Sequence, residues 1–384
     1  MMKSGNADVV IVGAGIIGLA HAYLAAKSGS KVVVLERHPA AGGASIANFG
    51  MLWPIGQTAG KMLDLALESR RLWLEILAAS GIPYKATGSL HIACRDDEAA
   101  VGKEFAQLAP AHGYQCEWLD RDEALARSPG IKENAILGAL WSATEATVDP
   151  RETLRQLPIF LETVFNVQFH WGCPALSVEG SEVRTPQGTW QAGRVIVCSG
   201  SDFETLYPEL FATSGLTRCR LQMLRTRAQP GGWDLGPSLA GGLTFRFYPS
   251  FGICSSLPAL RRRIAQETPE YDRFAIHTMV SQSSSGELTL GDSHEYGLVP
   301  SLFNREEIDA LILRHLETFV RVPDLSVAER WHGVYAKHFD KPYVRFHPED
   351  GVEVITGLGG AGMTLSFGVA AETLGLFSTE PVLA

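Results

Sequence analysis

The stretch Asp8–Arg37, which reads DVVIVGAGIIGLAHAYLAAKSGSKVVVLER, restricts the possible folds more than any other part of this chain. It opens with an apolar run, Val9–Val12, which is typical of a strand buried on both faces. Gly13, Gly15 and Gly18 follow with the spacing G-x-G-x-x-G. The first glycine allows a tight turn, the second lets the backbone approach a pyrophosphate, and the third lets a helix pack close to the strand. We therefore expect a parallel β–α–β unit.

The second half of this unit carries an acid where a dinucleotide site needs one. A helix is expected from about Ile16 to Lys27, with its N-terminal N–H groups facing the pyrophosphate. The next strand, Val32–Leu35, leads into Glu36, whose carboxylate would accept hydrogen bonds from the ribose hydroxyls and repel the extra phosphate of NADP. The alternative is a glycine-rich turn in an unrelated α/β protein. Strand, helix, second strand and acid in register favour a dinucleotide site.

Length and charge limit the remaining possibilities. The chain has 384 residues, which suggests two domains, and its 20% of charged residues is an ordinary globular share. A net charge of −9 argues against binding to nucleic acid. No apolar window is long enough to cross a bilayer, and only a short polar lead precedes the first strand, so we expect neither a transmembrane segment nor a secretory leader.

The cysteines give no sign of a metal site or of a disulfide framework. They are widely spaced, with no C-x-x-C pair and no histidine pattern typical of zinc. We expect reduced, mostly buried thiols in a cytoplasmic protein that holds no metal. The six cysteines are Cys94, Cys116, Cys173, Cys198, Cys219 and Cys254.

Three further glycine-rich or apolar segments favour FAD over NAD. The loop from Gly42 to Met51 is small enough to follow a pyrophosphate and a ribityl chain. The apolar strand at Val195–Cys198 ends in Ser199-Gly200, beside the expected phosphate path. The turn Gly357–Gly362 precedes a helix at Met363–Phe377, whose N-terminus can face the pyrimidine oxygen of a flavin.

These nucleotide-binding segments lie at both ends and in the middle of the chain, and alternating, β-rich sequence lies between them. The predicted fold class is α/β with an α+β second domain: a Rossmann-like FAD-binding domain is interleaved with a β-rich antiparallel substrate domain. We assign residues 1–80, 145–215 and 330–384 to the first domain, and residues 81–144 and 216–329 to the second.

The order of these elements resembles the FAD-dependent amine-oxidising superfamily that includes D-amino-acid oxidase, glycine oxidase and sarcosine oxidase. Trp331–Tyr335, Asp340–Tyr343 and Gly359–Thr364 look like the closing signature of the glycine-oxidase branch. Asn48–Met51 and Gly362–Gly368 are similar to a bacterial subgroup, the FAD-dependent oxidoreductases encoded in phosphonate-degradation gene clusters.

The resemblance implies a cofactor role for a set of residues spread over the chain. FAD would be non-covalent, because no cysteine follows Cys254 in the region where sarcosine oxidases attach their flavin. The implied contacts are Gly13, Gly15 and Gly18 with the pyrophosphate; Glu36 with the ribose; Arg37 and Ala175 with the adenine; Ser45, Asn48, Gly50 and Met51 with the phosphates and the flavin edge; Ser199 and Gly200 with the phosphate path; and Gly359, Gly360, Gly362, Met363 and Thr364 with the isoalloxazine.

One departure from the resemblance concerns the substrate. Tyr335 stands where the glycine-oxidase pattern has an arginine that forks onto the substrate carboxylate, and a tyrosine offers only one neutral hydrogen bond. Lys337 and His338 follow where the pattern has small residues. We also expect a strand at Phe245–Pro249, on which Arg246 and Tyr248 would face one pocket together.

These five side chains are the candidate contacts for a small amine that carries a phosphonate. No obligatory acid–base pair is expected. The alternatives are a surface cation for Arg246, core packing for Tyr248 and Tyr335, and a solvated turn for Lys337 and His338. Two further residues stay open: His294 as a loop residue or a pocket neighbour, and Trp53 as core or as the roof of the pocket.

The predicted activity is oxidation of a C–N bond by hydride transfer to flavin N5, followed by hydrolysis of the imine. The subgroup resemblance implies 2-aminoethylphosphonate or its N-methyl form as the substrate, phosphonoacetaldehyde as the product, and oxygen or another electron acceptor. The alternatives are a glycine, sarcosine or D-amino-acid oxidase, a quinone-linked dehydrogenase, a flavin-binding scaffold subunit of a larger complex, and the FAD domain of a tRNA-modifying enzyme. The acidic balance argues against the last of these. The oligomeric state is left open.

Overall fold

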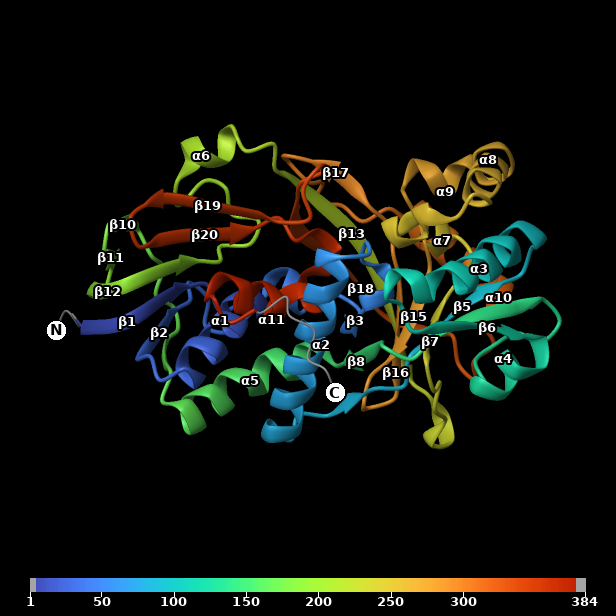
Figure 1. The fold of residues 1–384 in the computed structure, drawn as a ribbon, viewed down its shortest axis with the longest axis horizontal. Coiled ribbons are helices and arrows are strands. Elements are labelled where there is room, and N and C mark those ends of the chain that lie inside the picture. The colour runs from blue at the N-terminus through green and yellow to red at the C-terminus, as the bar shows by residue number, and fades with distance from the viewer. Residues whose placement is uncertain (1–4, 378–384) are drawn as a thin grey trace.

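Two large β-sheets form the framework of the protein, as seen in a computed structural model that describes residues 5–377. The first sheet has eight strands and lies towards the left of Figure 1, and the second has nine strands and lies towards the right. A small three-stranded sheet joins β3 (Met51–Leu52), β8 (Ala146–Val148) and β4 (Tyr84–Lys85). No helix among the described residues has the length and hydropathy needed to cross a bilayer.

The first sheet contains the predicted β–α–β unit. Its parallel strands β1 and β12 pair from Gly5 and Trp190 onward, and β2 pairs with the other side of β1. All four residues of β2 are buried, as expected for a strand covered on both faces. The eight strands are β1 (Gly5–Val12), β2 (Val32–Leu35), β9 (Gln168–His170), β10 (Ser177–Glu179), β11 (Glu182–Thr185), β12 (Gly188–Val197), β19 (Val344–Glu349) and β20 (Val352–Thr356).

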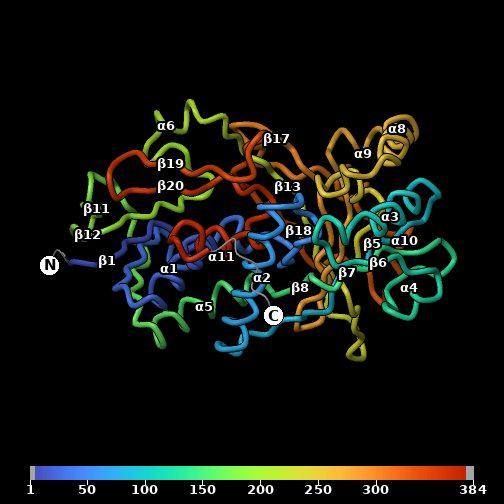
Figure 2. Tube along the Cα trace, in the orientation of Figure 1, coloured from blue at the N-terminus to red at the C-terminus, as the bar shows by residue number. Residues whose placement is uncertain are grey.

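Helices from both ends of the chain pack together beside this sheet. Figure 2 shows α11 (Gly362–Thr373), in red, next to α1 (Ile16–Lys27), in blue. The third helix of this group, α2 (Lys61–Ser80), approaches α11 so closely that a Cβ on Gly368 would lie 2.1 Å from the Leu65 carbonyl oxygen. The indole Nε1 of Trp73 on α2 donates to the Met363 carbonyl oxygen at 2.9 Å. The C-terminal segment is therefore fixed against the N-terminal half of the molecule.

The second sheet is largely antiparallel, and its strand order is β17-β13-β16-β15-β14-β5-β7-β6, with β18 paired to β13. Its strands are β5 (Ser89–Ala93), β6 (Cys116–Asp120), β7 (Gly138–Ser142), β13 (Thr217–Ala228), β14 (Ser238–Ala240), β15 (Met279–Gln282), β16 (Glu287–Gly291), β17 (Glu295–Gly297) and β18 (Val327–Lys337). The remaining helices are α3 (Asp96–Leu108), α4 (Arg121–Arg127), α5 (Pro150–Phe165), α6 (Pro208–Ala212), α7 (Thr244–Phe247), α8 (Leu257–Glu267), α9 (Pro269–Arg273) and α10 (Glu306–Phe319).

The predicted fold class is confirmed: strands of the two sheets alternate along the chain, and the first sheet is built from its beginning, middle and end. The domain boundaries given above stay a prediction, and β18 pairs with the second sheet. The strand expected at Phe245–Pro249 is wrong. Thr244–Phe247 forms the short helix α7, and Tyr248 follows it in an extended conformation.

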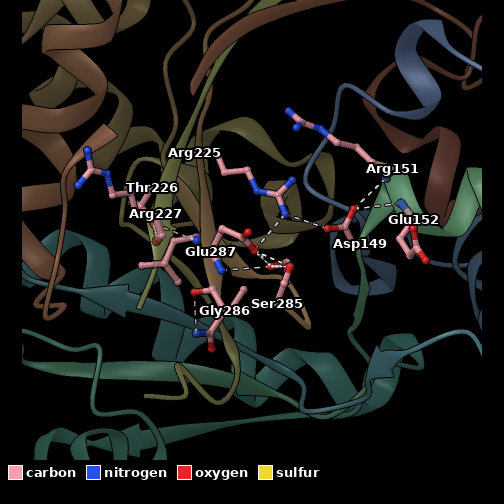
Figure 3. A network of polar contacts seen from close by, with 12 residues as sticks. Asp149, Arg151, Glu152, Arg225, Thr226, Arg227, Ser285, Gly286 and Glu287 are labelled. Atoms are coloured by element: carbon pink, nitrogen blue, oxygen red, sulfur yellow. Dashed lines mark hydrogen bonds and ion pairs between the residues drawn. The ribbon is translucent and has the colours of Figure 1, made fainter. Parts of the chain in front are cut away.

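An ion-pair network connects the second sheet to the N-terminus of α5 (Figure 3). Arg225 on β13 donates through Nη2 to Asp149 Oδ2 at 2.8 Å, and the same nitrogen lies 3.4 Å from Glu287 Oε2 on β16. Through its other oxygen, Asp149 accepts the backbone N–H groups of Arg151 and Glu152 and caps α5. One carboxylate therefore both caps α5 and neutralises a buried cation of the second sheet.

Candidate functional site

A cavity of about 640 Å³ lies along the carboxyl ends of the parallel strands. Val12 and Leu35 line it from the last residues of β1 and β2, and Cys198 and Thr356 line it at the ends of β12 and β20. Met223 on β13, in the second sheet, also lines it. Ligands of α/β proteins bind at this edge of a parallel sheet, so the site lies where the fold predicts it.

The three glycines of the motif have two different roles: two of them line the cavity, and the third allows close packing behind it. Gly13 and Gly15 line the cavity, and Gly13 has a φ of 103°, which favours glycine. Gly18 is not among the lining residues: a Cβ there would lie 1.9 Å from the Gly13 carbonyl oxygen, so its role is close packing of α1 on β1. The hydroxyl of Ser45 accepts the first helical N–H, that of Ile16, at 3.0 Å.

The end of the cavity that is predicted to hold adenosine is formed around Glu36. Its carboxylate is buried, lines the cavity, and accepts the backbone N–H of Ala14 at 2.8 Å and of His38 at 2.9 Å. These two bonds fix the carboxylate and leave lone pairs for ribose hydroxyls. Arg37 forms an ion pair with Asp202, and both residues line the cavity, as does Ala175.

The loop after β2 is held by its own asparagine. The side chain of Asn48 donates to the Ala44 carbonyl at 2.9 Å and accepts the Gly50 N–H at 2.7 Å, so it shapes the loop as well as lining the cavity. Gly50 does not line the cavity; a Cβ there would lie 1.9 Å from the Val148 carbonyl oxygen. Met51 does line it.

The C-terminal glycine turn closes the other end of the cavity. Gly359 has a φ of 60°, and α11 begins three residues later with its N-terminus towards the cavity. Thr364 accepts the backbone N–H of Trp53 at 2.9 Å, which ties this turn to the N-terminal half of the chain. Ser199, Gly200, Gly360, Gly362 and Met363 also line the cavity.

These residues fit FAD in both shape and charge. The cavity reaches from the buried acid Glu36, past the close-packed turn at Gly13, to a helix N-terminus that can stabilise negative charge on a reduced flavin. A β-carbon on Gly13 would lie 2.5 Å from the Cys198 carbonyl oxygen, so this turn has no room for a side chain.

Beyond the glycine turn, one part of the cavity is walled by aromatic side chains. Trp53, Tyr248 and Tyr335 line it together with Met279, and the Tyr248 hydroxyl lies 3.2 Å from the Met279 sulfur. Burial raises the pKa of both Tyr248 and Tyr335 well above its usual value, so both phenols stay neutral and can donate one hydrogen bond. We refer to this part of the cavity as the aromatic pocket.

A carboxylate in the aromatic pocket is a site residue that sequence reasoning missed. Asp292 lines the cavity directly after β16, with its Oδ1 atom 3.3 Å from His277 Nε2 and its Oδ2 atom 3.6 Å from His294 Nε2. Burial raises the pKa of Asp292 well above its usual value, lowers that of His277 well below it, and lowers that of His294 to about 4. The sequence marked His294 as a possible pocket neighbour but gave no reason to join it to His277.

The predicted substrate contacts are only partly brought together. Tyr248 and Tyr335 reach the aromatic pocket, but Arg246 does not line it. The Arg246 guanidinium instead pairs with Asp272 at 2.9 Å and donates to the Ile276 carbonyl at 3.1 Å. The expectation that Arg246 and Tyr248 face one pocket is therefore wrong, because they lie on a helix and its end.

Lys337 and His338, which follow Tyr335 and Ala336, differ in their surroundings. His338 accepts the backbone N–H groups of Asp340 and Lys341 through Nδ1 at 3.0 Å, so it orders a turn and does not line the cavity. Lys337 lies behind the cavity wall, against the glycine turn: a Cβ on Gly359 would be 2.9 Å from its Cδ atom and 3.5 Å from its Nζ atom.

Known proteins resemble this chain over most of its length. Glycine oxidase of Bacillus licheniformis is 24% identical over 368 residues, covering 89% of this chain and 85% of that protein. D-amino acid dehydrogenase of Cereibacter sphaeroides is 24% identical over 94% of this chain and 89% of its own length. The structure of glycine oxidase from Geobacillus kaustophilus superposes with a TM-score of 0.76, at 21% identity, over 98% of this chain and 97% of that one.

A family model described as FAD dependent oxidoreductase matches residues 8–375. A structure of L-alpha-glycerophosphate oxidase from Mycoplasma pneumoniae with FAD bound has the same fold, with a TM-score of 0.73 at 17% identity over 97% of this chain and 94% of that one. Because the family model extends from the first strand to the last helix, this protein belongs to the FAD-dependent oxidoreductase family and is an enzyme that uses FAD.

Proposed function

We propose that this protein oxidises the C–N bond of a small amine that also carries an anionic group. The substrate is an aminophosphonate, 2-aminoethylphosphonate or its N-methyl form, and the products are phosphonoacetaldehyde and ammonia or methylamine. Bound FAD would supply the hydride acceptor. The relatives named glycine oxidase and D-amino acid dehydrogenase support an amine as the hydride donor.

The observation that carries the anionic part of the proposal is the position of Lys337. Its side chain is half-buried beside the glycine turn, and burial lowers its pKa. Among residues 5–377, no carboxylate lies within 4.0 Å of its ammonium group. Lys337 has no carboxylate partner among these residues and does not itself line the cavity, so we infer that its long side chain reaches the anionic group of the ligand past the glycine turn, where a charge-assisted hydrogen bond would be strong.

The aromatic pocket argues against a simple α-amino acid. Tyr335 is two residues before Lys337 on β18, so both side chains leave the strand on the same side. A Cβ on Gly360 would lie 3.6 Å from the Tyr335 hydroxyl oxygen, which places this phenol at the glycine turn. Tyrosine cannot form the two parallel hydrogen bonds with which an arginine holds a carboxylate.

The proposal is tested by anaerobic reduction of the bound flavin, followed as the loss of its absorbance near 450 nm. The panel contains 2-aminoethylphosphonate, its N-methyl form, glycine, sarcosine, D-alanine and ethylamine. We expect the two aminophosphonates to give the highest second-order rate constants. Equal or faster reduction by glycine, sarcosine or D-alanine would overturn the phosphonate assignment, and no reduction by any amine would overturn amine oxidation. Peroxide formation in air then tells an oxidase from a dehydrogenase.

A substitution of Lys337 distinguishes binding of the substrate's anionic group from oxidation of its amine. Lys337→Met should lower kcat/KM for aminophosphonates by about 10- to 100-fold, since a hydrogen bond to a charged group contributes roughly 1.5–3 kcal/mol. The rate with ethylamine should stay unchanged, because it has no anion to lose. Lys341→Met is the matched control, as Lys341 is exposed in the following turn. An equal loss with ethylamine would show that Lys337 acts on the flavin and not on the substrate.

A further inference from the structure

We propose that Asp292, held between His277 and His294, binds the ammonium group of the substrate and accepts its proton. This inference rests on the proposed function, amine oxidation, and assigns a proton acceptor to it. The carboxylate belongs to the aromatic pocket, where it lines the cavity beside Tyr248 and Met279, while the two imidazoles lie behind it.

The backbone holds the three residues in one place. Asp292 follows β16 directly, and its N–H donates to the His277 carbonyl at 2.9 Å. The N–H of His294 donates to the Phe274 carbonyl at 2.7 Å. The rings of His277 and His294 stack with centroids 5.2 Å apart and an angle of 13° between their planes. These contacts hold the carboxylate and both imidazoles close together.

The hydrogen bonds of the cluster leave a place for one proton. His294 uses Nδ1 as a donor to the Ala275 carbonyl at 3.1 Å, so in the neutral ring Nε2 carries a lone pair. That lone pair faces Asp292 Oδ2 at 3.6 Å, and two lone pairs repel each other unless a proton lies between them. Asp292 and His294 together can thus receive one proton and hold it.

His277 completes the arrangement on the other side of the carboxylate. Neither of its ring nitrogens has a hydrogen-bond partner by strict geometry among the described residues, and Asp292 Oδ1 is without a partner as well. Nε2 and Oδ1 are 3.3 Å apart, so a proton on Nε2 points the imidazole at the carboxylate as a donor. His277 would orient Asp292 and is a positioning residue.

The groups around the cluster favour this assignment. The cations that act on it are Arg246, which affects both histidines, and Lys337, which affects His294; both disfavour a charged imidazole. His91 and His315 are buried and their pKa values are lowered to about 3, so they stay neutral. The thiol of Cys219 and the phenols Tyr248, Tyr296 and Tyr335, in which burial raises the pKa, stay protonated. Asp292 is thus the acid whose raised pKa makes its carboxylate a stronger base.

The proposed step balances without another reactant. An N–H bond of the ammonium group breaks, its electron pair stays on nitrogen, and an O–H bond forms on Asp292 Oδ2, facing His294 Nε2. The neutral amine then has the lone pair that assists loss of hydride from the adjacent carbon. His277, Asp292 and His294 each offer one ligand atom, and these three atoms lie within 4.8 Å of one another, so the cluster could also hold a divalent cation. The pairing of each carboxylate oxygen with its own imidazole favours a proton.

The test compares flavin reduction by the FAD-loaded Asp292→Asn variant with the wild type from pH 6 to 10.5. We expect the reduction rate at neutral pH to fall about 100-fold or more, since general-base catalysis contributes 10²–10⁴-fold. The loss should shrink as pH approaches the pKa of the free amine, about 10, because the substrate then arrives unprotonated. Bound flavin absorbance and thermal unfolding establish that the variant is folded. Asp234→Asn is the matched control, since Asp234 pairs with Lys85 at the surface.

A second pair of variants tests the positioning role. His277→Gln keeps an N–H donor towards Asp292 and should retain the rate within about threefold, whereas His277→Leu should lower it. The inference is overturned if folded Asp292→Asn keeps the wild-type rate at neutral pH, or loses the same factor at every pH. Stoichiometric divalent metal, removed by a chelator together with activity, would overturn it in favour of a metal site. Failure of every amine to reduce the wild-type flavin would instead overturn the proposed function.

Discussion

Gly18 offers a direct test of how the first β–α–β unit builds the cofactor site. The change Gly18→Ala places a methyl group 1.9 Å from the Gly13 carbonyl oxygen. To reach ordinary van der Waals contact, the helix and the turn must separate by roughly 1.5 Å. The turn cannot move alone, because the Gly13 N–H donates to the Leu35 carbonyl at 2.8 Å.

Two opposing effects determine how far Gly18→Ala changes the free energy of unfolding. Alanine is favoured over glycine inside a helix by about 1 kcal/mol. Overpacking costs typically 1–3 kcal/mol, and a contact this short against backbone belongs at the upper end. We expect the free energy of unfolding of the apoprotein to fall by about 1–2 kcal/mol. The FAD dissociation constant should rise at least about tenfold, because the displaced helix no longer points its N–H groups at the pyrophosphate.

The assay pairs urea unfolding of the apoprotein with a fluorescence titration of FAD. Gly15→Ala separates the two readouts, since a Cβ on this cavity-lining residue meets only the Ser45 hydroxyl, at 3.1 Å. It should weaken FAD binding while leaving the apoprotein near wild-type stability. Gly252→Ala, with open space around its Cβ, should change neither. Wild-type stability together with wild-type FAD affinity in Gly18→Ala would refute the packing role assigned to this glycine.

Three further predictions concern stability, all measured by urea unfolding. Trp73→Phe removes the hydrogen bonds to the Met363 carbonyl and the Ser366 hydroxyl and should cost about 1–3 kcal/mol; an unchanged midpoint would contradict the proposed tie between α2 and α11. Asp149→Asn leaves Arg225 with the more distant Glu287 and should destabilise the protein more than the surface control Asp234→Asn. Equal losses of stability in the two variants would contradict a structural role for the ion-pair network of Figure 3. Burial raises the pKa of Glu145, so its stabilising contribution is full below about pH 4.5 and is lost as pH rises through the folded pKa. Glu145→Gln should therefore flatten the pH dependence above pH 4.5, and a slope equal to that of the wild type would contradict this.

Local sequence predicted the elements whose own residues decide their structure. The helix Ile16–Lys27 and the strand Val32–Leu35 were predicted with the bounds that the structure shows, because glycine turn, apolar run and terminal acid all act within one unit. The helix α5 is another element decided by its own residues: Asp149 caps it and Pro150 is its first residue.

Tertiary contacts decided the rest. Thr244–Phe247 alternates polar and aromatic residues, which predicts a strand, yet Arg246 binds the Ile276 carbonyl and Asp272, and the segment is helical. The pairing of Asp292 with His277 depends on two segments that meet only after folding. No spacing rule joins an acid to a histidine fifteen positions earlier, and so the most polar part of the aromatic pocket was missed.

The tie between Trp53 and Thr364 has a consequence for protein synthesis. The two residues are 311 positions apart, and both line the cofactor cavity. At about 5–20 residues per second, a ribosome needs roughly 15–60 s to make the second after the first. During that interval the emerging chain already carries the glycine motif and Glu36 but not the glycine turn. The complete cofactor cavity can therefore form only on a nearly finished chain.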